Sequence, residues 1–220
     1  METVFATATA PGKSGVAVIR ISGPQASHAV AVLAPGVTLF PRKAILAPLR
    51  HPDTHALIDQ ALLLYFPAPA SFTGEEVVEL HIHGSLAVKA ELLALLGALP
   101  GFRLASAGEF SRRAFINGKM DLTEAEGLAD LIDAETQAQH RLAVRQMQGE
   151  LRRLYDGWRE RIIYILAHLE AYIDFPDEDI PETVLATLTE ECVALKTSMA
   201  AHLNDDRRGE KLRAGLHIAI

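Results

Sequence analysis

The sequence predicts an α+β protein, with a mixed domain of strands and helices over residues 1–118 followed by an all-helical bundle segment. Two observations support this fold class. Before residue 118, short apolar runs alternate as half-buried strands do, and runs at helical spacing separate them. Beyond residue 123, apolar residues recur only at intervals of three and four, which is typical of amphipathic helices. Strands and helices are therefore expected in one domain and helices alone in the next.

The composition is that of a globular protein. The chain has 220 residues, of which 49% are hydrophobic and 22% are charged. Its single cysteine, Cys192, excludes an internal disulfide and a cysteine-based zinc site. No apolar run is long enough to span a membrane, and the first residues lack the pattern of a secretory signal peptide. We therefore expect a protein of the reducing cytoplasm with no membrane partner.

The charge distribution bears on nucleic-acid binding. The formal net charge is −7, which argues against holding nucleic acid by bulk electrostatics. Arginines crowd the segment 141–161, but acidic residues are interleaved with them. This pattern favours a solvated helix face over a phosphate-binding track.

The first elements are two strands and a helix, expected at residues 3–9, 16–22 and 26–33. Arg20 lies inside the second strand, so its charge must face solvent, a partner or a ligand. Between the strands, Gly-Lys-Ser at residues 12–14 suggests a phosphate-binding loop. The upstream glycine of that motif is missing, so we predict an ordinary turn.

Further strands are expected at residues 44–49 and 60–66, but the most informative strand is Val77–His83. One of its faces is apolar, and the other carries a carboxylate and two imidazoles, Glu79, His81 and His83. These groups could bind zinc or iron. Because no further ligand pattern accompanies them, we predict no metal site and favour a polar face over a pocket or subunit contact. A helix is expected next, over residues 85–99.

The stretch from Ala107 to Thr136 joins the two parts of the chain. Residues 111–116 are expected to form one or two helical turns that present Arg112 and Arg113, and Asn117-Gly118 is a strong turn signal. From composition alone, a domain linker with a solvated charged loop is an equally good interpretation.

The helices beyond this stretch have clear sequence signals. Thr123 and Glu126 fit a capping box that opens a helix. An apolar stripe from Met147 to Tyr172 is expected to pack against other helices, and Cys192 is expected as a small core residue on a further helix. The last residues, 215–220, have the apolar character of a strand.

The stretch beginning at Ala107 resembles the signature of the MnmE (TrmE) family of tRNA modification GTPases, P-G-E-F-[ST]-x-R-A-F-L-N-x-K-x-D-L-x-Q-A-E. Ala107 replaces the usual proline, and Glu124 stands where glutamine is common. Other family elements recur elsewhere: R-x-S-G-P at 20–24, F-T-G-E at 72–75, H-G-S in place of H-G-G at 83–85, and I-D-F-P-x-E-x-I at 173–180. Ser85 stands where the family has its second glycine, which argues against a close backbone approach that requires glycine at this position.

The resemblance covers essentially the whole chain and implies a function. Family members are cytoplasmic enzymes that, with the flavoprotein MnmG, add an aminomethyl-type group to carbon 5 of the wobble uridine of certain tRNAs. It implies a folate-binding and dimerisation domain at 1–118, similar to tetrahydrofolate-binding aminomethyltransferases. It also implies the first part of a helical domain at 119–212, and the first strand of an otherwise absent G domain at 213–220. The GTP, Mg²⁺ and K⁺ sites and all catalytic residues would lie in that absent domain.

The resemblance also implies a cofactor and its ligands. The expected cofactor is 5-formyltetrahydrofolate or a related one-carbon donor, bound within a homodimer. Glu79, Arg20 and Lys119 match the family's folate-binding positions. These residue types fit such a role, because a carboxylate can accept a bidentate pair from a pterin and the cations suit carboxylates and carbonyls. Two alternatives stay open: a non-catalytic dimerisation and adaptor module with a vestigial folate site, and a metal-dependent hydrolase that uses His81 and His83.

Overall fold

The computed structural model describes residues 2–174, 182–204 and 209. Contacts within the chain divide it into two compact units, Met1–Met120 and Asp121–Ile220. The first unit has a mixed sheet with helices and the second is helical, so the predicted α+β class is confirmed. The strand predicted over 213–220 and most of the I-D-F-P element lie outside the described residues.

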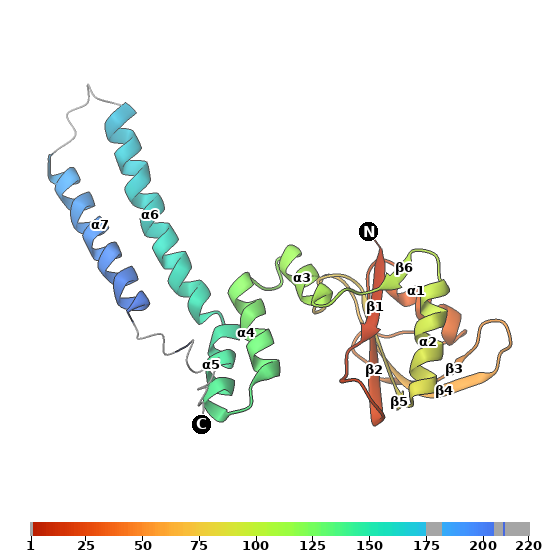
Figure 1. The fold of residues 1–220 in the computed structure, drawn as a ribbon. Helices are drawn as coiled ribbons and strands as arrows, with labels where there is room; N and C mark the ends of the chain where they lie inside the picture. Colours follow the sequence, from red (N-terminus) through yellow and green to blue (C-terminus); the bar gives the residue numbers. More distant parts are fainter. Residues whose placement is uncertain (1, 175–181, 205–208, 210–220) are drawn as a thin grey trace, which may run out of the picture. The chain divides into compact units, whose positions relative to one another are not determined.

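A six-stranded sheet forms the centre of the first unit (Figure 1). Its strands are β1 (Thr3–Thr7), β2 (Ser14–Ser22), β3 (Ile45–Arg50), β4 (Leu57–Phe66), β5 (Val77–Gly84) and β6 (Phe102–Leu104). They are arranged in the order β3-β4-β5-β2-β1-β6. Only the β1–β6 pair is parallel among these strands, and the others are antiparallel. This order brings β2 and β5 together, and these two strands carry Arg20 and Glu79.

The two faces of the sheet have different surroundings. Helices α1 (Ala26–Leu33) and α2 (Leu86–Ala98) contribute to one buried core with one face of the sheet. The predicted alternation of β5 is confirmed, because Val78, Leu80 and Ile82 lie in this core. The opposite face of the sheet carries exposed apolar side chains on β2, β3 and β4: Val16, Leu46 and Leu62.

Close backbone approach occurs at the first glycine of the H-G-S element. A Cβ on Gly84 would collide with the backbone of Ser14, its register partner on β2. Ser85 is the residue before α2 and has extended backbone angles. The element therefore needs glycine at Gly84, where β5 passes Ser14, while its third position is free to carry a side chain.

The capping prediction for the first helix of the second unit was wrong by two residues. Helix α4 spans Leu122–Asp133, and its capping box is formed by Asp121 and Glu124. Oδ1 of Asp121 accepts from the Glu124 amide at 2.8 Å, and Oε2 of Glu124 accepts from the Asp121 amide at 2.8 Å. Thr123 takes part differently, because its hydroxyl donates to the Asp121 carboxylate. Aspartate is a preferred N-cap residue because its carboxylate accepts from the orphan amides of the first turn.

The predicted stripe from Met147 to Tyr172 is divided between two helices. Helix α5 (Gln137–Met147) ends before Gly149, whose φ of 74° stops it, and α6 (Glu150–Asp174) begins at the next residue. Helix α7 (Glu182–Leu203) lies beside α6 (Figure 1).

The prediction that this stripe packs against another helix is confirmed, because α6 contacts α7, but the expectation that Cys192 is a core residue was wrong. No described residue of α6 is fully buried, and Ile162, Leu169 and Tyr172 are exposed. Cys192 on α7 is exposed as well. Two helices side by side can bury only the narrow strip along their contact, where Leu188 and Leu195 of α7 are enclosed. Within the described residues, none of the helices is both long and apolar enough to cross a membrane.

Candidate functional site

An ion pair on neighbouring strands lies at the centre of the candidate site. Arg20 and Glu79 are register partners on β2 and β5. Nη2 and Nε of Arg20 both contact Oε1 of Glu79, at 2.8 and 2.9 Å. The Glu79 side chain is only 14% exposed, so water screens the pair weakly. The structure therefore brings two of the three predicted site residues into direct contact.

Two phenylalanine rings lie beside the Arg20 guanidinium. Its Cζ is 5.4 Å from the ring centroid of Phe72 and 5.7 Å from that of Phe110. Such distances allow cation–π attraction. Phe72 belongs to the F-T-G-E element and Phe110 to the G-E-F element, which are far apart in sequence. Both motifs are visible in the sequence, but no sequence signal indicated that they meet beside Arg20.

The two histidines of β5 face different carboxylates. Nε2 of His81 lies 3.2 Å from Oε2 of Glu79, and Nδ1 of His83 lies 2.7 Å from Oδ1 of Asp59 on β4. Asp59 also accepts from the backbone amide of His83. Among the described residues, no group of three or more potential ligands is arranged to hold a metal. The arrangement is one of separate carboxylate–imidazole pairs.

Lys119, the third predicted residue, lies on the turn after α3 (Glu109–Ile116) and is exposed. Its Nζ donates to the carbonyl of Pro69 at 3.1 Å. Its side chain also borders Gly74, where an added Cβ would lie 3.3 Å from Cγ of Lys119. The loop of residues 71–76 therefore contacts Lys119 through Gly74 and Arg20 through Phe72.

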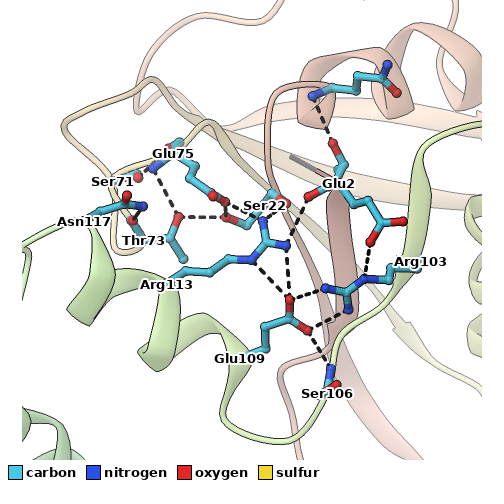
Figure 2. A network of polar contacts seen from close by, with 12 residues as sticks. Glu2, Ser22, Ser71, Thr73, Glu75, Arg103, Ser106, Glu109, Arg113 and Asn117 are labelled. Carbon is cyan, nitrogen blue, oxygen red and sulfur yellow. Dashed lines mark hydrogen bonds and ion pairs between the residues drawn. The ribbon is translucent and has the colours of Figure 1, made fainter.

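A buried polar network fastens α3 to this loop (Figure 2). The predicted helical turns are confirmed, but of their two arginines Arg112 is exposed, whereas Arg113 is only 6% exposed. Its guanidinium donates to Glu75 at 2.8 Å and to Glu109 at 3.1 Å. The i,i+4 spacing of Glu109 and Arg113 is visible in the sequence and could have indicated their pairing. The interpretation as a solvated linker loop does not describe residues 109–116.

Glu109 is the most strongly perturbed carboxylate of the network. Arg103 donates to both of its oxygens, at 2.6 and 2.8 Å, and the Ser106 amide adds a third hydrogen bond. The Arg103 hydrogen bonds are the main cause that lowers the pKa of Glu109 to about 2, against the opposing effect of burial. Glu109 therefore stays ionised at neutral pH and accepts hydrogen bonds from Arg113.

Comparisons with known proteins match the whole chain. The family model described as "GTP-binding protein TrmE N-terminus" matches residues 3–119, and that described as "MnmE helical domain" matches residues 122–217. Proteins named "tRNA modification GTPase MnmE" from Parvibaculum lavamentivorans and Rhodospirillum rubrum are 57% and 54% identical over all of this chain. The alignments cover 50% and 51% of those proteins.

A eukaryotic protein shows the same likeness. The Danio rerio protein named "5-taurinomethyluridine-[tRNA] synthase subunit GTPB3, mitochondrial" is 50% identical over all of this chain, which corresponds to 44% of its own length. The chain thus spans about half the length of the relatives it matches.

Proposed function

Because the chain belongs to the MnmE (TrmE) family of tRNA modification GTPases, we propose that it supplies the folate-binding and dimerisation part of such an enzyme. The longer protein then hydrolyses GTP with Mg²⁺ and K⁺ in a further domain. Together with the flavoprotein MnmG, it adds an aminomethyl-type group to carbon 5 of the wobble uridine of tRNA in the cytoplasm. A reduced folate such as 5-formyltetrahydrofolate supplies the one-carbon unit when it is bound.

The observation that carries the folate part is the partly buried Arg20–Glu79 pair, which lies next to two aromatic rings. A pterin edge offers an N–H and an amino group side by side, and a carboxylate accepts both. Oε1 of Glu79 already receives two contacts from Arg20. Since an oxygen has two lone pairs, Arg20 must yield at least one contact when the pterin arrives. The released donors can then face the carbonyl oxygens of the ligand.

The other residues fit the rest of such a ligand. The rings of Phe72 and Phe110 offer apolar faces to a planar heterocycle. Lys119 is exposed and carries a positive charge, which suits the carboxylate tail of a folate. The residues present therefore match the donor, acceptor and charge pattern of a reduced folate.

A calorimetric titration of the chain with 5-formyltetrahydrofolate tests this proposal. We expect saturable binding that Arg20→Ala and Lys119→Ala weaken in a salt-dependent manner, because both cations would meet ligand charge. Asp59→Asn is the matched control, since Asp59 pairs with His83 on the same sheet but is not assigned to the ligand. Absence of binding by the folded wild-type chain would refute the folate site.

A second candidate function is a non-catalytic dimerisation and adaptor module. The observation that favours it is the pairing of both Glu79 oxygens, one with Arg20 and the other with His81. A carboxylate paired in this way needs no ligand to satisfy its oxygens. The same titration separates the two functions, because an adaptor with a vestigial site dimerises but gives no saturable folate signal.

A further inference from the structure

Arg113 uses its whole guanidinium to join four segments of the first unit (Figure 2). Nε and Nη2 donate to Oε1 of Glu109, at 3.3 and 3.1 Å, and Nη1 donates to Oε2 of Glu75 at 2.8 Å. The remaining contacts are to backbone carbonyls, those of Glu2 at 3.1 Å and Ser22 at 3.5 Å. Five contacts match the five N–H groups of the side chain. No donor of Arg113 is left over for a ligand.

The ion pair between Arg113 and Glu75 joins helix α3 to the loop of residues 71–76. These two segments carry the two phenylalanine rings that lie beside Arg20. Phe110 lies on α3, the same helix as Arg113, and Phe72 lies in the same loop as Glu75. The 2.8 Å contact between Arg113 and Glu75 therefore ties the helix that carries Phe110 to the loop that carries Phe72. The Cζ atom of Arg20 lies 5.4 Å from the ring centroid of Phe72 and 5.7 Å from that of Phe110.

The contact between α3 and the loop of residues 71–76 also affects the position of Lys119. Nδ2 of Asn117, just after α3, donates to the carbonyl of Thr73 at 2.7 Å. Gly74, with a φ of 78°, comes so close to α3's following turn that a Cβ would lie 3.0 Å from Cβ of Asn117. Because Lys119 borders the same glycine, a shift of the loop against α3 would also move Lys119.

Glu75 makes this connection sensitive to the loss of Arg113. Its Oε2 accepts from Ser22 and Arg113, whereas its Oε1 is buried without a hydrogen-bond partner among the described residues. Without Arg113, an enclosed carboxylate would lose the cation that offsets its charge. Such a group is costly to keep buried, so the loop of residues 71–76 would open to hydrate it.

We propose that Arg113 is a positioning residue of the ligand site: paired with Glu75, it holds Phe72 and Phe110 at the spacing that encloses Arg20. Its effect on ligand affinity rests on the folate function proposed above, while its effect on Arg20 does not. Affinity should therefore depend on a residue that touches no ligand atom.

The experiment compares Arg113→Met with Arg112→Met, which removes an exposed arginine from the neighbouring position of the same helix. The first readout is the NMR resonance of the Arg20 Nε–H, which the two rings and the Glu79 hydrogen bond set apart from solvent-exposed arginines. The second readout is the affinity for 5-formyltetrahydrofolate. We expect Arg113→Met to move the Arg20 resonance toward the exposed position and to weaken binding roughly tenfold or more. Arg112→Met should change neither.

A second variant tests whether misfolding, and not positioning, explains the effect of Arg113→Met. Arg113→Lys keeps the charge beside Glu75 but supplies fewer donors, so an intermediate effect on both readouts is expected. A double-mutant cycle with Arg20→Ala then separates positioning from general destabilisation. If Arg113 positions Arg20, the Arg113 substitution costs less affinity when Arg20 is already alanine, and the cost that remains comes from the displaced Lys119 and rings. Fully independent effects would simply add.

The outcomes are distinguishable from failure of the proposed function. An unchanged Arg20 resonance in folded Arg113→Met or Arg113→Lys protein overturns the positioning inference, and so do additive effects in the cycle. If the wild-type chain binds no folate, the proposed function fails, but the resonance comparison still decides whether Arg113 positions Arg20.

Discussion

Glu79 is the residue on which the ligand proposal depends most directly, so we predict the effect of Glu79→Gln. The amide keeps the shape of the side chain, and its oxygen can still accept from Arg20. Its NH₂ group, however, would face a pterin donor and leave both unpaired in an enclosed site. We expect a loss of about 2–4 kcal/mol, or roughly thirty- to a thousand-fold in folate affinity, by titration calorimetry.

The same substitution should leave the fold intact, because Glu79 lies on the polar face of β5 and not in the core. Circular dichroism and the unfolding midpoint provide this check. Wild-type affinity in a folded Glu79→Gln protein would remove Glu79 from the ligand site and favour the adaptor function.

Glu109 gives a prediction about stability in acid. Its pKa is lowered from 4.5 to about 2, chiefly by Arg103, so its ionised form stabilises the folded state. That contribution is complete above the unfolded pKa and is lost as pH falls from about 4.5 to about 2. Because Arg103 is 40% exposed, solvent screens the pair, and we expect a contribution of about 1–2 kcal/mol.

Urea unfolding of the first unit at a series of pH values measures this contribution. Other carboxylates titrate in the same range, so the informative quantity is the difference between wild type and Glu109→Gln. The difference in unfolding free energy should be largest at neutral pH and shrink below pH about 4. A constant difference down to pH about 2 would contradict the assignment.

At the scale of elements, the cap of α4 can be tested directly. Oδ1 of Asp121 accepts from the Glu124 amide. Burial alone would raise the pKa of Asp121, but hydrogen bonds from Glu124 and Thr123 and the charge of Arg152 together lower it. We expect Asp121→Ala to destabilise the second unit by about 0.5–2 kcal/mol, measured by chemical unfolding. Glu126→Ala is the matched control, since Glu126 is exposed and belongs to the box predicted from sequence. Equal effects of the two substitutions would contradict the observed cap.

Local signals in the sequence predicted the elements well but their ends less well. The alternation of β5 and the spacing of α2 follow from contacts between near neighbours, and both were predicted correctly. The start of α4 was misplaced because two overlapping patterns fit a capping box, and only backbone geometry selects Asp121. The break at Gly149 was missed because its apolar neighbours continue the helical spacing across it.

The geometry of the candidate site was predictable only in part. Family resemblance singled out Arg20 and Glu79 as candidates, but their contact depends on β2 and β5 being neighbours, which is a property of sheet order. The burial of Arg113 depends on Glu2, Ser22 and Glu75 meeting at one point from distant parts of the chain. No local pattern encodes such a meeting, because charged residues on a short helix look alike whether they face solvent or a network.

At the scale of the whole molecule, we expect a second copy of the chain to bind to the face of the sheet opposite helices α1 and α2. The face presents Leu46, which is 70% exposed, beside Leu62, its register partner on β4. Leu62 is in turn paired in register with His81, so the apolar surface continues to the edge of the candidate site. Exposed apolar side chains in neighbouring positions form a patch that association would cover.

We therefore predict that the chain sediments as a dimer at micromolar concentration and that Leu62→Glu shifts it toward monomer. A carboxylate at the centre of the contact would have to be desolvated without a partner, which weakens association by roughly tenfold or more. Leu104→Glu is the control, because Leu104 is also exposed but lies on β6 at the opposite edge of the sheet. A folded wild-type chain that sediments only as monomer, or equal dissociation by the two variants, would contradict association through this face.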